Sequence, residues 1–128
     1  MKTKITWLQK VTIPTPYYCL CLNQEQFNLA LKQLKIKDKC NYILNSHSHA
    51  TTHTYDNGND LCCIVCLDIT NESSLAATIS LLVHESVHIY QNLLERIGEK
   101  ETGKETEAYM IQSISQNLIK QYLNETNS

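Results

Sequence analysis

The longest segment with helical periodicity runs from Leu75 to Ile97 and is followed by Gly98, a residue typical of helix C-termini. Apolar side chains occur on most sides of this helix, so other parts of the chain must cover it. A chain of 128 residues has enough surface to enclose one core but not two. We therefore expect a single domain, residues 1–128, organised around this helix.

Two segments before the long helix have the composition of β-strands. "YILNSHSHATTHTY" and "LCCIVCLDIT" are rich in β-branched and aromatic residues, and "DNGND" between them predicts a tight turn. The pair is expected to form a β-hairpin. Residues 5–13 and the segment "YYCLCL" predict further extended chain near the N-terminus. Together these segments predict a small antiparallel sheet.

Capping patterns predict two other helices. Asn23 with Gln26 opens an amphipathic helix that continues to about Ile36, and Thr102 with Glu105 opens a last helix. The apolar face of the last helix comprises Ile111, Ile114, Leu118 and Tyr122. The predicted fold class is α+β, with a small antiparallel β-sheet packed against the long helix and flanked by the first amphipathic helix and the last helix, which carries Glu107.

Charge and hydropathy exclude several partner classes. The chain carries 11 Lys and Arg against 13 Asp and Glu, so it lacks the positive charge that nucleic-acid binding requires. No apolar run approaches the roughly 18 residues of a membrane span, and the N-terminus has no unbroken apolar stretch of a signal peptide. We expect a soluble, cytoplasmic protein with neither nucleic-acid nor membrane partners, and the sequence leaves its oligomeric state open.

Six cysteines could form disulfides, bind a metal or remain reduced. Cys62 and Cys63 are adjacent and point to opposite faces of a strand, and Cys66 follows Cys63 within the same strand pattern rather than at a turn. Reduced, buried thiols are therefore expected. Disulfides and a cysteine-based metal site remain the alternatives.

The segment "HESVH" within the long helix is an HExxH motif. Because His84 and His88 are four residues apart, their imidazoles lie one turn apart on the same side of the helix and can bind one ion. Glu85 is rotated by about 100° and is placed to act as a general base on water. The alternative is a purely structural role, in which the helix binds no metal and the two histidines are buried and hydrogen-bonded.

A catalytic zinc site commonly takes three protein ligands. Glu107 shares a helical side with Ile111 and Ile114, so we expect it to point inward as the third ligand. Tyr109 and Gln112 are candidates for polar contacts around the ligands. The competing acids, expected to be solvated, are Glu95, Glu99, Glu101 and Glu105.

HESVH, then eighteen residues, then Glu107 with Ala108 after it resembles the gluzincin zinc metallopeptidases over about residues 73–123. The pattern "HESVHIYQ" with "ETEAYMIQSI" is also similar to small metallopeptidase-like proteins of tailed phages and prophages. The resemblance implies a minimal zincin-like fold whose strand beside the motif helix borders the substrate cleft. Larger gluzincins use a Tyr or His from a further domain to stabilise the oxyanion; here Tyr109, Tyr55 and His53 are the candidates.

The sequence thus predicts a Zn²⁺-dependent metallopeptidase that cleaves a peptide or protein substrate, with Glu85 as general base for a zinc-activated water. The alternative is a non-catalytic zinc-binding accessory protein. His47, His49 and His53 would share one face of a strand, which could line the cleft or bind a second metal; the alternative is a polar, partly exposed face of the hairpin.

Overall fold

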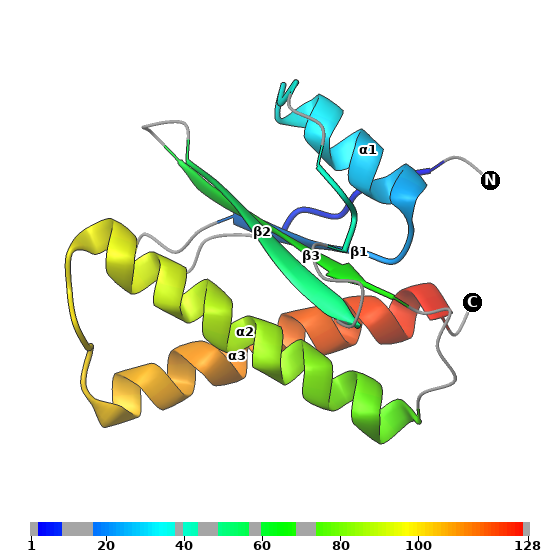
Figure 1. The fold of residues 1–128 in the computed structure, drawn as a ribbon. Helices are drawn as coiled ribbons and strands as arrows, with labels where there is room; N and C mark the ends of the chain where they lie inside the picture. The colour runs from blue at the N-terminus through cyan, green and yellow to red at the C-terminus, as the bar shows by residue number, and fades with distance from the viewer. Residues whose placement is uncertain are drawn as a thin grey trace.

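The computed structural model describes residues 3–8, 17–37, 40–43, 49–56, 60–68 and 74–126. In this part of the chain the fold is α+β, with three helices and a small three-stranded mixed sheet (Figure 1). The elements in chain order are β1 (Tyr17–Cys21), α1 (Gln24–Gln33), β2 (Ala50–Asp56), β3 (Leu61–Leu67), α2 (Leu75–Ile97) and α3 (Lys104–Thr126).

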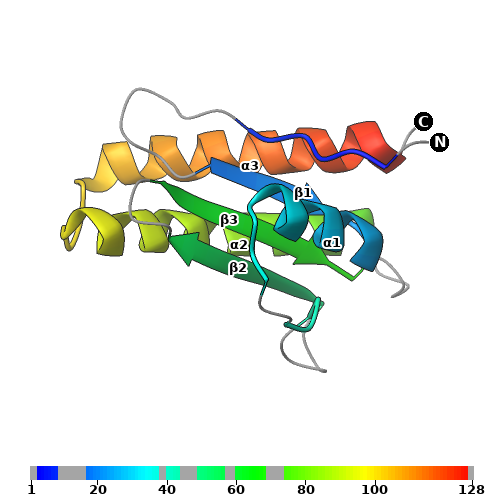
Figure 2. The ribbon, with the colours of Figure 1, turned by 90° about the horizontal axis from the view of Figure 1, so that it is seen from above.

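The sheet lies between two helical layers. Helix α1 covers one face, while α2 and α3 pack side by side on the other, with α3 along β1 and α2 along β2 and β3 (Figures 1 and 2). The core between the sheet and the α2–α3 pair includes Leu20, Val65, Leu82, Ile89, Ile114 and Leu118. The core under α1 includes Cys19, Cys21, Phe27, Ala30, Ile64 and Cys66.

Strand β3 is the central strand, in the order β1-β3-β2, and all seven of its residues are buried. The predicted pairing of the two strands is confirmed, since β2 pairs antiparallel with β3 and His53 lies opposite Ile64. The described strand begins only at Ala50, and residues 44–48 of the predicted strand and 57–59 of the predicted turn lie outside the described residues. Strand β1 pairs with β3 in parallel, so the expectation of a purely antiparallel sheet was wrong. The connection from β1 to β3 contains α1 and β2, and a long connection of that kind permits a parallel pair.

The predicted helix boundaries are largely confirmed. Asn23 Oδ1 accepts a hydrogen bond from Gln26 N at 2.8 Å, which caps α1. Helix α2 ends at Gly98, whose φ of 74° is the left-handed conformation that glycine adopts without strain. Ile114 and Leu118 are buried on the inner side of α3, as the apolar pattern predicted.

Other local expectations fail or fall outside the described residues. The capping box at Thr102 was wrong: α3 begins at Lys104, and the Thr102 hydroxyl lies 2.7 Å from Tyr90 Oη instead. Of the predicted extended segment 5–13, residues 5–8 are described; they form no regular strand, although Leu8 makes an isolated bridge to Tyr18. Residues 9–13 lie outside the described part.

All six cysteines are free thiols, and five of them are buried. Reduced cysteines were the expected state, and in this fold they fill space on both faces of β3 and on the face of β1 that lies under α1. None of the helices in the described part of the chain has an apolar stretch long enough for a membrane crossing.

Candidate metal centre

Helix α2 positions the motif residues by its rotation against the sheet. Ser74 caps its first turn, with Ala77 N donating to Ser74 Oγ at 3.1 Å. Glu85 lies on the buried side that faces the strands, whereas His84 and His88 lie on the neighbouring flank and are exposed. The alternative of two buried core histidines is therefore excluded.

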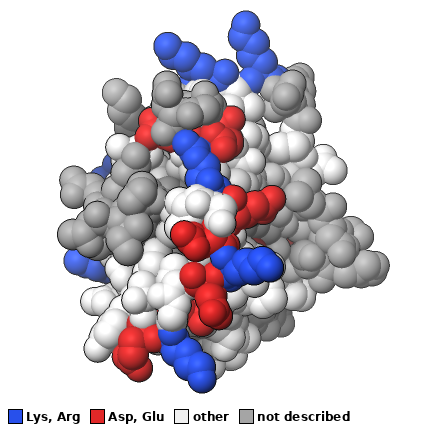
Figure 3. Space-filling model, turned by 90° about the vertical axis from the view of Figure 1, so that its left-hand side faces the viewer, with Lys and Arg blue, Asp and Glu red and all other residues white. Residues whose placement is uncertain are grey.

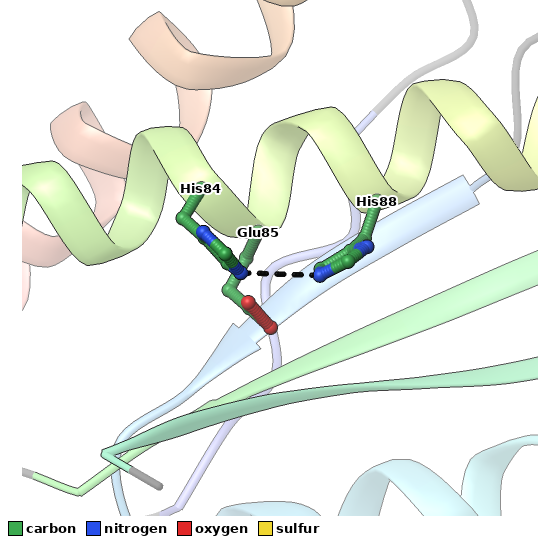
Figure 4. A group of neighbouring side chains, drawn as sticks. All are labelled: His84, Glu85 and His88. Carbon is green, nitrogen blue, oxygen red and sulfur yellow. Dashed lines mark hydrogen bonds between the residues drawn. The ribbon is translucent and has the colours of Figure 1, made fainter.

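The two imidazoles already have the spacing of a metal-binding pair. His84 Nε2 and His88 Nε2 are 3.2 Å apart, with the ring planes at 77° (Figure 4). Two nitrogens bound at about 2.0–2.1 Å to one tetrahedral zinc ion lie roughly 3.3 Å apart. The donor pair thus fits a zinc ion without a rearrangement of the helix.

Gln91 fixes the orientation of the His88 ring. Its side-chain carbonyl Oε1 lies 3.1 Å from His88 Nδ1, and because a carbonyl oxygen only accepts, Nδ1 carries the proton. In neutral His88 the lone pair is then on Nε2, the atom that faces His84. A hydrogen bond to the second ring nitrogen is the usual support for a metal-binding histidine. Sequence reasoning missed Gln91, although its i+3 spacing from His88 could have indicated it.

Glu85 is only 4% exposed, and its carboxylate is held by the neighbouring strand. The Thr52 hydroxyl of β2 donates to Glu85 Oε1 at 3.1 Å. One ligand-type atom from each of His84, Glu85 and His88 lies within 4.8 Å of the others, and Figure 4 shows the three side chains gathered together beside α2. Thr52 is a second residue that sequence reasoning missed, because the contact joins segments 33 residues apart.

The expectation that Glu107 points into the core was wrong. Glu107 lies in the first turn of α3 and is exposed, and it is not part of the group formed by His84, Glu85 and His88. Helix α3 packs against the side of α2 that carries Tyr90, which is roughly opposite the two histidines at 100° per residue. In the first turn of α3, Lys104, Glu105 and Glu107 are exposed, and the buried residues of this helix begin only at Ile114.

The end of the molecule at the α2–α3 turn has a mixed charge. Figure 3 shows acidic and basic side chains interleaved on this face. The competing acids Glu95, Glu99, Glu101 and Glu105 are all exposed, as expected. The described residues of this face therefore present no field of a single sign that would attract a polyanion.

None of the four residues proposed as polar assistants is hydrogen-bonded to His84 or His88. Tyr109 is 66% exposed on α3, and Gln112 is also exposed there. His53 and Tyr55 belong to β2, but successive side chains of a strand alternate, and these two face α1 rather than α2. The sequence prediction placed them on the wrong face of the sheet.

The expected face of three histidines does not form in the described strand. His49 precedes β2 and is exposed, while His53 is buried under α1. His47 lies outside the described residues. Neither the cleft-lining nor the exposed-strand interpretation applies to His53.

No protein-family model matches this chain, and neither a curated protein nor a solved structure matches it. The features of this chain that indicate a function are therefore the side chains that α2 and β2 bring together. The group of two imidazole nitrogens and one carboxylate could hold a metal ion, and imidazole nitrogens suit zinc, copper, iron or nickel better than magnesium or calcium.

Proposed function

We propose that the protein is a zinc-dependent hydrolase of peptide bonds, with His84 and His88 as metal ligands and Glu85 as the general base. The observation that carries the proposal is the 3.2 Å separation of the two Nε2 atoms beside a buried carboxylate. An exposed metal-binding pair next to a buried carboxylate combines the two requirements of metal-assisted hydrolysis, a Lewis acid and a positioned base. The preference for peptide bonds comes from the HExxH pattern.

Each residue has a defined task in this mechanism. A bound zinc ion supplies Lewis-acid polarisation and makes water more acidic. Glu85 accepts the proton of the attacking water and donates it to the leaving amine, while the Thr52 hydroxyl keeps the carboxylate in place. Gln91 holds the His88 ring so that Nε2 faces the ion.

The proposed ligand set does not include Glu107. Its carboxylate is exposed on α3, and α3 packs on the side of α2 away from the histidines. With His84 and His88 as the two protein ligands, the remaining coordination positions would be left to water or substrate, and the exposure of both rings leaves room for them. Glu107→Ala is therefore expected to retain zinc, which contrasts with the expectation from the sequence resemblance.

Elemental analysis and a cleavage assay test the proposal together. Wild-type protein and Glu85→Gln should each contain about one zinc per chain, whereas His84→Ala and His88→Ala should contain none. Wild type should cleave members of a mixed peptide library, detected by mass spectrometry, and Glu85→Gln should cleave none. Zinc binding without cleavage by wild type would favour the accessory protein, and absence of zinc would refute both functions.

A further inference from the structure

A second group of reactive side chains lies on the opposite face of the sheet from the histidine pair. The Cys40 Sγ atom is 3.8 Å from His53 Nδ1 and 3.3 Å from the Tyr55 hydroxyl oxygen. His53 and Tyr55 are alternate residues of β2 and share the face that α1 covers. The group brings a thiol, an imidazole and a phenol into contact.

The His53 imidazole is oriented so that its basic nitrogen faces the thiol. His53 Nε2 is 2.9 Å from the backbone carbonyl oxygen of Tyr42, and since that oxygen only accepts, Nε2 carries the proton. The unprotonated Nδ1 therefore faces Cys40. The ring is 5% exposed and packs on Phe27 with 4.7 Å between centroids, which prevents it from turning away. A base with its second nitrogen bound to an orienting acceptor is the arrangement that activates nucleophiles.

Cys40 differs from the other five cysteines in its accessibility. The other five are buried, whereas Cys40 is half-buried and lines a surface pocket of about 810 Å³. Three lysines, Lys32, Lys35 and Lys37, line the same pocket. They are exposed, and no carboxylate is among the described residues that line the pocket. The thiol thus opens onto a positively charged surface, which is the environment in which thiols react.

We propose that Cys40 and His53 form a nucleophile–base pair whose lysine-lined pocket takes small anionic electrophiles, such as a carboxylate or phosphate ester with a reactive carbon. The thiol proton passes to His53 Nδ1, the sulfur forms a bond to the electrophilic carbon, and the leaving group departs with its bonding electrons. The Tyr55 hydroxyl is placed to donate to the sulfur as its negative charge develops. This site is independent of the proposed hydrolase, because it lies across the sheet from α2.

Two alkylating reagents of the same chemistry but different charge provide the test. Iodoacetate is an anion and iodoacetamide is neutral; each forms an S–C bond to Cys40 and releases iodide. Labelling at pH 7 is followed by peptide mass spectrometry in native and urea-unfolded protein. Native Cys40 should react on the order of tenfold faster than unfolded Cys40, and its iodoacetate-to-iodoacetamide rate ratio should be several times higher than in the unfolded chain.

Variants separate the base from the pocket. His53→Gln should slow both reagents equally, which leaves the rate ratio unchanged. The double change Lys35→Gln with Lys37→Gln, or added salt, should lower the ratio because it weakens the attraction of the anion. Cys40→Ser should abolish labelling and leave the zinc content unchanged.

A native Cys40 that reacts no faster than the unfolded thiol would overturn the proposal, and this comparison needs no variant that could misfold. A rate ratio that is unaffected by removal of the two lysines would show that the pocket does not select anions. Equal labelling rates of wild type and a folded His53→Gln would show that the contact between sulfur and imidazole is structural only.

Discussion

At the scale of single residues, the buried carboxylate of Glu85 is the group on which the proposed chemistry depends. A carboxylate that is 4% exposed is costly unless hydrogen-bond donors compensate for lost water, and Thr52 supplies one. The contact therefore stabilises the fold as well as the proposed base. Removal of the donor should affect both properties.

Thr52→Val keeps the β-branched shape and removes the hydroxyl. We expect the free energy of unfolding to fall by about 1.5–3 kcal/mol, the range for a hydrogen bond to a charged group, with zinc content unchanged and peptide cleavage slower. Urea unfolding measures the first effect. Thr54→Val is the matched control, because Thr54 lies on the same face of β2 but bonds to Asn92 rather than to Glu85.

Gln91→Leu tests the support of the His88 ring. Loss of the carbonyl that accepts from Nδ1 should weaken zinc binding by about 10–100-fold, as is typical for residues that orient metal ligands. A zinc titration against a competing chelator measures the change. Gln91→Glu retains an acceptor at the same place and should bind zinc at least as tightly as wild type; equal weakening in both variants would contradict the assigned role.

At the scale of elements, α2 and β2 act as one unit. Thr52 contacts Glu85, Thr54 contacts Asn92, and Asp56 pairs with Arg96 at 2.6 Å, so polar contacts follow the whole strand. These contacts fix how α2 is rotated on the sheet. The rotation in turn places the histidines on the open flank and Glu85 against the strand.

The start of α2 offers an independent measure of how much this helix depends on its cap. Ser74→Ala removes the side chain that accepts from Ala77 N and should lower the free energy of unfolding by about 1 kcal/mol. Ser80→Ala is the control, since Ser80 Oγ donates only to the carbonyl of Ala76 within the same helix. A loss in Ser80→Ala as large as that in Ser74→Ala would show that the cap is not responsible.

Local sequence patterns predicted the helices and strands well, whereas features that depend on contacts between distant segments were not predicted. The bounds of α2 and the convergence of His84 with His88 follow from spacing within one helix, so the sequence could predict them. The prediction for Glu107 failed for a different reason. The position of this residue depends on how α3 is rotated relative to α2. Apolar periodicity identifies the inner side of a helix only where a core lies opposite it. The parallel direction of β1 likewise depends on a long connection that has no local signal.

At the scale of the whole molecule, the sheet separates two regions of different chemistry. The histidine pair and Glu85 lie on the α2 side, while Cys40 and His53 lie on the α1 side. Central strand β3 is buried on both faces and contributes thiols to both cores. Because these buried thiols ionise less readily than exposed ones, the stability of the fold changes with pH in the alkaline range.

Burial raises the pKa of the Cys63 thiol from 9.0 to about 12, although a hydrogen bond from Thr54 opposes the shift. Between these two values the folded protein binds the proton more tightly than the unfolded chain does. The stabilisation is therefore complete below about pH 9 and is lost as the pH rises towards 12. Urea unfolding between pH 8 and pH 11 should show a falling free energy of unfolding, with a shallower slope in Cys63→Ala; partly buried Tyr42, whose pKa is also raised, accounts for part of the remaining slope.

Strand β2 serves both regions because its side chains alternate: Thr52 belongs to one and His53 to the other. Insertion or deletion of a single amino acid inside β2 would invert this alternation downstream of the change, and the two chemistries would be lost together. A substitution at Thr52 or at His53, by contrast, can abolish the chemistry of one site and leave the other intact. The amino acid at a single position of β2 can therefore change at the expense of one site only. The number of residues between Ala50 and Asp56 is constrained by both sites.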